Sequence, residues 1–128
     1  MTNYIGDAIE VMSTMGEDQY GAVVTSPPYN IGIDYGNYKD NMKDADYHEF
    51  TKDWVKQSLR VAPVAVTNFG APTSSAVNLA KFMIAVMMIK IVGTPSKILD
   101  PFMGAGTTRL AAQNLNVEAD GIDLKEWT

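Results

Sequence analysis

The sequence predicts an α/β fold with a mainly parallel sheet and helices on both of its faces. Short apolar runs of strand length alternate with longer segments whose apolar residues recur at helical spacing. No internal repeat or low-complexity segment interrupts this alternation. The 128 residues suit a single domain that buries roughly two-thirds of the surface of its unfolded chain. We therefore expect one domain over residues 1–128.

The first half of the chain contains strand and helix patterns in alternation. Ile9, Met12 and Met15 recur at helical spacing, and the apolar run Ala22–Thr25 has the length of a buried strand. In order, we expect a strand at 4–5, a turn at 6–7, a helix over 8–15, a strand over 22–25, a loop over 30–45, a helix over 46–61 and a strand over 64–69. The helix over 46–61 is expected to carry on one side Phe50, Trp54, Val55, Ser58 and Leu59.

The second half continues this alternation. A long helix, capped by Ser74 or Ser75 and reaching to about Ile91, is rich in alanine and methionine and is expected to pack in the core. It is followed by a strand over 97–100, a helix over 107–115 and a strand over 118–123. Asp120 and Gly121 weaken the prediction of the last strand, because both residue types are uncommon in strands.

Several kinds of site are excluded by the composition. The chain has no cysteine, so it forms neither disulfides nor thiolate metal sites, and its single histidine, His48, gives little basis for a zinc centre or a serine-type triad. His48 and Trp54 are expected to be a surface and a core residue, respectively. The N-terminus lacks the pattern of a signal peptide, and the longest apolar run, 82–92, is broken by Lys90 and too short to cross a bilayer. We expect no metal, no membrane association and a cytoplasmic location.

The net charge of −5 argues against tight DNA binding by a monomer. Affinity for duplex DNA comes mainly from lysine and arginine, and here ten basic residues stand against fifteen acidic ones. One stretch gathers basic residues, but acidic residues are interspersed, so a solvated helix face is expected. The basic ones are Lys39, Lys43, Lys52, Lys56 and Arg60; the acidic ones are Asp40, Asp44, Asp46, Glu49 and Asp53.

A glycine-containing turn near the C-terminus has the layout of a nucleotide-binding site. A strand ends at Asp100, Gly104-x-Gly106 follows, and a helix begins at Thr107. Asp123 lies at the end of the next strand, where a carboxylate accepts hydrogen bonds from ribose hydroxyls. The turn lacks the three-glycine pyrophosphate fingerprint, which favours S-adenosylmethionine, a cofactor without phosphates, over a dinucleotide. Considered alone, a Gly-x-Gly also fits an ordinary tight turn.

Ser26-Pro27-Pro28-Tyr29 follows the buried strand of the first half. Two consecutive prolines stiffen a loop, and groups on a stiff loop are held in place before a reaction begins. An ordinary Pro-Pro turn with a packed tyrosine is the alternative interpretation of this segment.

Together, Thr25–Asn30 and Asp100–Thr108 resemble the catalytic and cofactor loops of S-adenosylmethionine-dependent DNA amino-methyltransferases (adenine-N6 or cytosine-N4). The catalytic loop precedes the cofactor loop, as in the circularly permuted, beta class of this family. The resemblance implies a Rossmann-like class I methyltransferase core, with a catalytic-loop half over 1–70 and a cofactor-binding half over 71–128. The resemblance also implies a protein of a restriction-modification system, or a minimal, phage-like member of this family.

The resemblance implies a role for each residue of the two loops. Asp100 would anchor the methionine end of the cofactor, Asp123 the ribose, and Asp7, at the end of the N-terminal strand, the adenine amine. A plain turn aspartate is the alternative for Asp7. The full implied cofactor set is Asp7, Asp100, Pro101, Phe102, Gly104, Gly106, Thr107, Thr108 and Asp123.

Ser26, Pro27, Pro28 and Tyr29 are the implied catalytic residues. The Ser26 side chain and the Pro27 carbonyl would accept hydrogen bonds from the target amine, and Tyr29 would stack on a flipped base. Serine in the first position favours cytosine over adenine, and both bases stay open.

The chain departs from the family in its middle. Helix and strand elements, including an antiparallel terminal hairpin and a target-recognition segment, are expected to be missing after Phe69-Gly70, and Ala71, Ser74 and Ser75 replace the family's usual residues. The uncovered sheet edge predicts self-association as a homodimer, or a partner subunit that supplies target recognition. Two alternatives to a DNA methyltransferase remain: a weak or inactive cofactor-binding remnant, and an enzyme that methylates protein glutamine or RNA.

Overall fold

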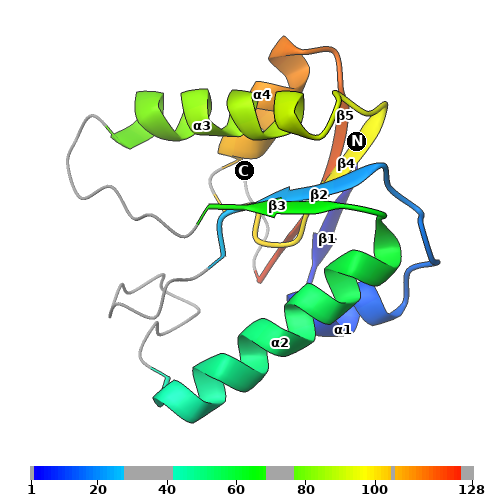
Figure 1. Cartoon of the computed structure of the whole chain (residues 1–128), viewed down its shortest axis with the longest axis vertical. Helices are drawn as coiled ribbons and strands as arrows, with labels where there is room; N and C mark the ends of the chain where they lie inside the picture. Colours follow the sequence, from blue (N-terminus) through cyan, green and yellow to red (C-terminus); the bar gives the residue numbers. More distant parts are fainter. Residues whose placement is uncertain (1, 28–41, 69–76, 105, 125–128) are drawn as a thin grey trace.

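The computed structural model describes residues 2–27, 42–68, 77–104 and 106–124 (Figure 1). Strands and helices alternate throughout, as expected for an α/β fold. In chain order they are β1 (Asn3–Ile5), α1 (Ala8–Ser13), β2 (Ala22–Thr25), α2 (Asp44–Val61), β3 (Ala65–Thr67), α3 (Val77–Ile91), β4 (Lys97–Asp100), α4 (Thr107–Asn114) and β5 (Glu118–Asp123).

The five strands of the described residues form one parallel sheet in the order β1-β5-β4-β2-β3. The first strand lies beside the last, with Ile5 opposite Asp123. This placement confirms the prediction that Tyr4-Ile5 continues the sheet from the strand that ends at Asp123. The described strands contain no antiparallel pair, and β3 forms one edge of the sheet.

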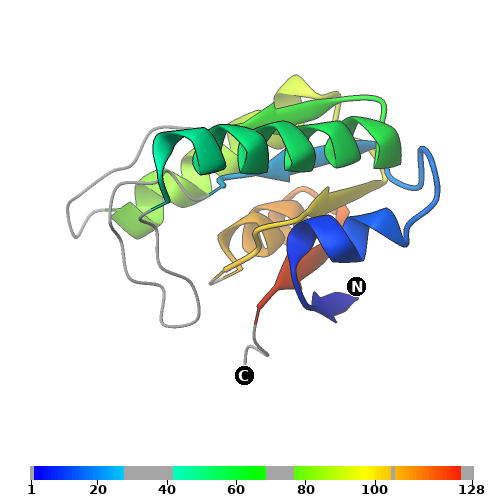
Figure 2. The ribbon, with the colours of Figure 1, turned by 90° about the horizontal axis from the view of Figure 1, so that it is seen from below.

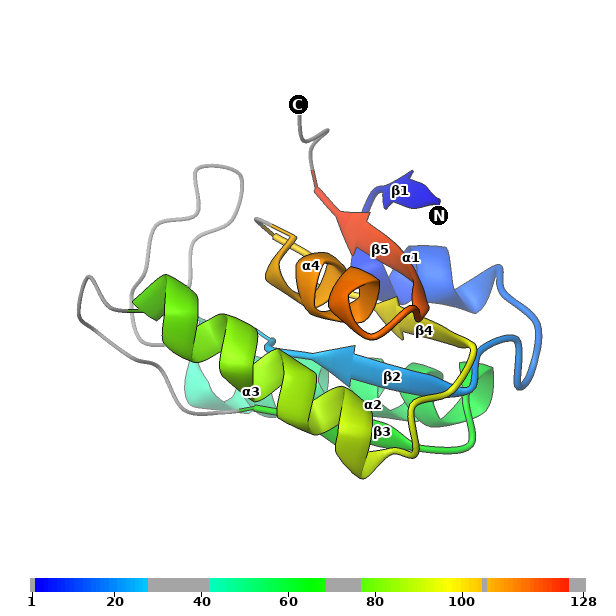
Figure 3. The ribbon, with the colours of Figure 1, turned by 90° about the horizontal axis from the view of Figure 1, so that it is seen from above.

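Two helices cover each face of the sheet, which confirms the predicted layers. Figure 2 shows α1 and α2 in front of one face, and Figure 3 shows α3 and α4 in front of the other. The alternation of side chains along β2 explains the division: Val23 packs with α1 and α2, whereas Ala22 and Val24 pack with α3 and α4. The strands are therefore apolar on both faces, as parallel strands usually are.

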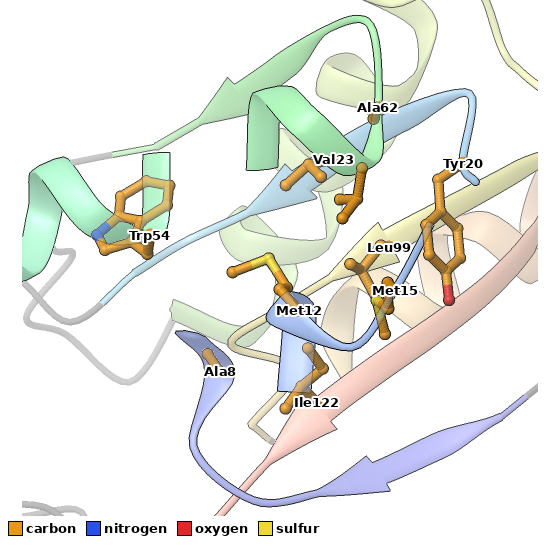
Figure 4. Close-up of a cluster of buried hydrophobic side chains, with 10 residues drawn as sticks. Ala8, Met12, Met15, Tyr20, Val23, Trp54, Ala62, Leu99 and Ile122 are labelled. Carbon is orange, nitrogen blue, oxygen red and sulfur yellow. The ribbon is translucent and has the colours of Figure 1, made fainter. Parts of the chain in front are cut away.

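The core under α1 and α2 contains Trp54, which is 1% exposed and lies toward one end of the cluster (Figure 4). Met12, Leu99 and Ile122 complete this cluster from α1, β4 and β5. Trp54 was predicted as a core residue and His48 as a surface residue, and both predictions are confirmed. Leu59 was placed on the buried side of α2, but it is 54% exposed. The step from Trp54 to Leu59 is not a whole number of helical turns, so the two side chains point to different sides and Leu59 faces outward.

Arg60 also differs from the expected solvated helix face. Lys43, Lys52 and Lys56 are exposed, but the Arg60 guanidinium donates to the carbonyls of Met12 and Met15 at 2.6 and 2.8 Å. Met12 lies in the last turn of α1 and Met15 just beyond its end, where carbonyls are available to donors outside the helix. Arg60 therefore fixes α2 to the end of α1.

The ends of the helices differ slightly from the predictions. α1 stops at Ser13 instead of Met15, because the side chains of Ser13 and Thr14 donate to carbonyls of the last turn. Met15 is nevertheless buried, as predicted. α2 begins at Asp44, earlier than expected, and carries Asp44 and Asp46 in its first turn, where the helix dipole favours acidic groups.

α3 begins at Val77, and its proposed caps, Ser74 and Ser75, lie outside the described residues together with Phe69, Gly70 and Ala71. The prediction that this helix packs in the core is correct for Ala85, Met88 and Ile89. It is wrong for Met83, Met87 and Ile91, which are exposed and recur at every fourth position along the helix. A helix that covers a sheet buries only one of its faces.

The strand over 118–123 is formed although it contains Asp120. This carboxylate is 1% exposed and accepts hydrogen bonds from the Tyr20 hydroxyl and the Thr2 amide, each at 2.7 Å. Lys97 lies 3.2 Å from it. Burial opposes ionisation of Asp120, but these hydrogen bonds and the lysine outweigh burial and lower its pKa. The buried charge of Asp120 in β5 is thus compensated by two hydrogen bonds and one ion pair.

Within the described ranges, no helix is long and apolar enough to cross a membrane. The same part of the chain contains no group of three or more histidine, aspartate or glutamate side chains that could hold a metal ion.

Candidate active site

The sequence-predicted site residues follow the carboxyl ends of four strands. Thr25 ends β2, Asp100 ends β4, Asp123 ends β5, and Asp7 comes shortly after the end of β1. Parallel strands bring these ends to one edge of the sheet. The chain leaves β4 toward β5 but leaves β2 toward β3, so the strand order reverses between β2 and β4. Ligands of open α/β sheets bind in the crevice at this reversal.

Asp100 is the most buried acidic group of the site, with 2% of its surface exposed. Its Oδ1 atom accepts hydrogen bonds from the Thr25 hydroxyl at 2.5 Å and from the Phe102 amide at 3.0 Å. Burial raises the pKa of this carboxyl to about 6, hydrogen bonds from Thr108, Thr25 and Phe102 limit the rise, and the charge of Asp123 adds to it. A cation that binds next to this buried carboxylate stabilises its ionised form.

The loop after Asp100 is held back against the sheet. The Met103 amide donates to the Ile122 carbonyl, and the Gly106 amide to the Met103 carbonyl, both at 3.0 Å. Gly104 and Gly106 have φ angles of +52° and +86°, in the region that favours glycine. A Cβ atom built at Gly106 meets no other described atom within 4 Å. The loop therefore leaves room for a ligand to approach its backbone.

Gly121 shows why the loop lies so close to β5. A Cβ atom at this position would come within 2.5 to 2.8 Å of the Met103 side chain. Gly121 weakened the prediction of this strand, but its lack of a side chain allows the loop after Asp100 to pack over the strand.

Phe102 packs against two aromatic side chains of α2. Its ring centroid lies 5.5 Å from that of Trp54 and 5.9 Å from that of Phe50, both in edge-on geometry. Sequence reasoning did not connect α2 with this loop. The spacing between Phe50 and Trp54 placed both on one helix face, but nothing in the sequence indicated that Phe102 would meet them.

Asp123 and Asp7 lie at the ends of neighbouring strands, since the Gly6 amide donates to the Asp123 carbonyl at 2.8 Å. Asp123 is half-buried, and its Oδ1 accepts a hydrogen bond from the Leu124 amide at 2.7 Å. Asp7 is exposed and caps α1, its Oδ1 accepting from the Glu10 amide at 3.1 Å. This cap is a role that the sequence analysis did not assign to Asp7.

The segment after β2 is described only at its start. Ser26 is exposed and Pro27 is buried, whereas Pro28 and Tyr29 lie outside the described residues. The remaining predicted residues lie in the loop and first turn after β4: Pro101 and Thr108, which are buried, and Gly104 and Thr107, which are half-buried. Apart from Pro28 and Tyr29, the predicted residues thus gather at one edge of the sheet.

These groups fit a nucleoside that carries positive charge. A buried carboxylate whose pKa is raised suits a cationic group, a half-buried carboxylate at the end of the next strand suits ribose hydroxyls, and the glycine loop offers open space. S-adenosylmethionine has a sulfonium, an ammonium group and a ribose, and carries no phosphate.

A family model described as a DNA methylase, for N6 and N4 methyltransferases, matches residues 63–127, about half of the chain. This range contains Asp100, the glycine loop and Asp123.

Two curated proteins are similar over shorter stretches. The type II methyltransferase M.HpaI of Haemophilus parainfluenzae is 36% identical over 55 residues, which are 43% of this chain and 18% of that protein. The type II methyltransferase M.MjaVI of Methanocaldococcus jannaschii is 49% identical over 37 residues, 29% of this chain and 19% of that protein. The matched stretches thus span less than a fifth of these relatives.

Solved structures share the fold over nearly the whole chain. A candidate DNA modification methylase of Thermus thermophilus aligns with a TM-score of 0.66 and 16% identity, covering 97% of this chain and 89% of that one. The cytosine-N4-specific PvuII DNA methyltransferase also aligns with a TM-score of 0.66, at 12% identity, covering 96% of this chain and 81% of that one. The predicted methyltransferase-like α/β fold is confirmed.

Proposed function

Because the chain belongs to the N6/N4 DNA methylase family, we propose that it transfers the methyl group of S-adenosylmethionine to the exocyclic amine of a DNA base, cytosine N4 or adenine N6. One observation carries this proposal. The start of the Ser-Pro-Pro-Tyr segment and the Asp100 loop follow adjacent strands, and the 2.5 Å hydrogen bond from Thr25 to Asp100 joins the two strand ends. A methyl acceptor and a methyl donor bound at these segments would meet.

In this proposal, the cofactor lies over the ends of β4, β5 and β1. Asp100 holds the ammonium end, Asp123 accepts from the ribose hydroxyls, and Asp7 accepts from the adenine amine with the oxygen that does not cap α1. The glycine loop provides close backbone contact. Pro101, Phe102, Gly104, Gly106, Thr107 and Thr108 complete the proposed binding segment.

The proposed catalytic task of the chain is to hold the target amine. The bound cofactor supplies a methyl group on a cationic sulfur, which is already activated for transfer. An exocyclic amine is a poor nucleophile, because its lone pair is delocalised into the ring. The Ser26 side chain and the Pro27 carbonyl would accept hydrogen bonds from its two N–H groups, Tyr29 would stack on the flipped base, and Pro28 would stiffen the segment. Hydrogen-bond acceptors fixed before the reaction stabilise the charge that develops on the nitrogen.

The DNA substrate poses a separate requirement. With a net charge of −5, this chain alone provides little of the phosphate neutralisation on which DNA affinity depends. A second copy would bring the same negative charge, so we propose that a subunit with a basic surface contributes to DNA binding. The described edge strand β3 is the place for such contact, since its outer side pairs with no described strand.

The alternative function is binding of the cofactor without methyl transfer by this chain alone. The acidic charge favours it, as does the small part of the curated relatives, 18% and 19%, that the matched stretches span.

Incubation with labelled S-adenosylmethionine and unmodified genomic DNA tests the proposal, followed by digestion and mass spectrometry of the nucleosides. N4-methylcytosine or N6-methyladenine supports the proposal and identifies the base. RNA and total protein are included as acceptors, so labelled RNA or glutamine would replace DNA as the substrate. Asp100→Ala is expected to abolish labelling, whereas Gln113→Ala, an exposed change at the end of α4, serves as the matched control. Cofactor binding without any methylated product would support the alternative.

A further inference from the structure

Thr25 joins two segments to which the proposed function assigns different tasks. It is the last residue of β2, it is 1% exposed, and it directly precedes Ser26 and Pro27. Its hydroxyl donates to Asp100 Oδ1 at 2.5 Å, at the end of the neighbouring strand β4. Both groups are buried, so rotation of either side chain would leave the other without this bond, which is costly away from water.

The other two donors to Asp100 belong to the segment that follows it. Phe102 is in the loop after β4, and Thr108 is in the first turn of α4. Of these three donors, only Thr25 comes from the half of the chain that carries the Ser-Pro-Pro-Tyr segment. The carbonyl of Thr25 also accepts from the Asn68 amide at 3.1 Å, so the end of β3 is held by the same residue.

Building on the proposed function, we propose that Thr25 is a positioning residue of the methyl transfer: its hydroxyl orients the Asp100 carboxylate for the cofactor and keeps Ser26 and Pro27 aligned with the methyl donor. Backbone pairing between β2 and β4 extends only to Val23 and Leu99, and so ends before Thr25 and Asp100. Beyond that point Thr25 pairs with Thr67 of β3 and Asp100 with Gly121 of β5, so the hydroxyl–carboxylate bond is the direct link between the two strand ends. Displacements of about 1 Å at a reacting centre are enough to lower a rate about a hundredfold.

Two substitutions separate the hydroxyl from the shape of the side chain. Thr25→Val keeps the volume and removes the donor, whereas Thr25→Ser keeps the donor. In the cofactor-free protein, the Asp100 carboxyl is titrated by NMR. Thr25→Val should raise the pKa of Asp100 by about one unit, the size expected for one hydrogen bond to an ionised carboxylate, and Thr25→Ser should leave it near the wild-type value. Asp123, the charged group that also acts on Asp100, is titrated in the same spectra.

The second readout is function. Thr25→Val should weaken the binding of S-adenosylmethionine about tenfold at pH 7, and it should lower kcat by a larger factor than it changes KM. With Thr25→Ser, both the affinity and kcat should stay near the wild-type values. Thr25→Ala replaces Thr25→Val if urea denaturation shows that the valine variant does not fold. Unchanged Asp100 titration, together with cofactor affinity and kcat within twofold of wild type, would overturn the proposal.

The two proposals fail in different ways. A wild-type protein that binds no S-adenosylmethionine would contradict the proposed function. The titration of Asp100 is measured without cofactor, so it decides separately whether Thr25 holds the carboxylate.

Discussion

Asp100 is ionised at neutral pH in a place where folding disfavours its charge. Its pKa of about 6 in the folded protein lies above the ordinary value of 3.8. Between these two values the folded state binds more protons than the unfolded state, so stability falls as pH rises from about 4 to about 6. At pH 7 this difference in pKa lowers the free energy of unfolding by about 3 kcal/mol. Proteins often tolerate such a cost at a functional site.

Asp100→Asn removes the charge but keeps an oxygen that accepts from Thr25. We expect the free energy of unfolding at pH 7.5 to rise by up to about 3 kcal/mol, and the gain to disappear near pH 4, where wild-type Asp100 is protonated. Urea denaturation at both pH values measures this. S-adenosylmethionine affinity should fall in the same variant. An equal gain at pH 4 and pH 7.5 would mean that the charge of Asp100 is not the cause.

Gly121→Ala is expected to destabilise the protein by about 2 kcal/mol, because the added Cβ atom would overlap Met103. Thermal unfolding measures the change. The matched test is a double-mutant cycle with Met103→Ala, which removes the overlapping Cγ and Cε atoms and leaves only Cβ. The two substitutions together should cost less than the sum of their separate effects. Strict additivity would show that the loop does not lie over β5 at this point.

At the scale of residues, sequence patterns predicted a part of the structure. Trp54 and His48 were assigned correctly, because size and polarity alone decide where such residues are most stable. Arg60 was not, since its partners lie on and after α1, and Leu59 was not, since it is rotated away from Trp54 around the axis of α2. The same holds for Phe102, whose aromatic neighbours on α2 are distant from it in the sequence.

The helix α3 has one exposed face and one buried face, and two adjacent methionines allow this orientation to be tested. Met87 is 59% exposed, whereas its neighbour Met88 is 6% exposed and packs in the core with Ile98 and Ala111. Met88→Ala should lower the free energy of unfolding by about 2 to 4 kcal/mol, because it leaves a cavity. Met87→Ala should change it by less than about 0.5 kcal/mol. Urea denaturation of both variants measures the contrast, and similar losses would contradict the described orientation of α3.

At the scale of elements, the alternation of strands and helices was predictable and their ends were not. The type of each element follows from the period of its apolar residues, which extends over many positions. The ends depend on local hydrogen bonds, such as those of Ser13 and Thr14 at the end of α1. The strand β5 was the least certain element. It contains Asp120, and the residues that pair with this carboxylate, Tyr20 and Lys97, lie far away in the sequence.

At the scale of the whole molecule, ligand binding should be visible as stability. A ligand that binds only the folded state, at one hundred times its Kd, adds about 2.7 kcal/mol, or about 10 °C in Tm for a domain of this size. We expect this shift with S-adenosylmethionine at pH 7.5 and a clearly smaller one at pH 5, where Asp100 is mostly protonated and attracts a cation less. Differential scanning fluorimetry measures both. A shift that is independent of pH would contradict the assignment of Asp100 to the cationic part of the cofactor.

The fold of the whole chain was the most predictable level. Two motifs and their order implied a permuted methyltransferase-like core, and the sheet order places the N-terminal strand beside the strand that ends at Asp123, as that resemblance required. The division of the chain at residue 70 into a catalytic-loop half and a cofactor-binding half stays a prediction. The boundary lies in the segment 69–76, outside the described residues.

The pairing of β1 with β5 has a consequence for how the protein is made. Asn3 lies opposite Gly121, so this contact closes a loop that contains the described strands β2, β3 and β4. Contacts between such distant positions slow folding, because the entropy of loop closure is lost before the contact forms. During synthesis, β1 leaves the ribosome before the other strands, but it cannot pair until β5 has been translated. Asp7 and Asp123 therefore come together only after that step, and the nascent chain has no assembled site before it.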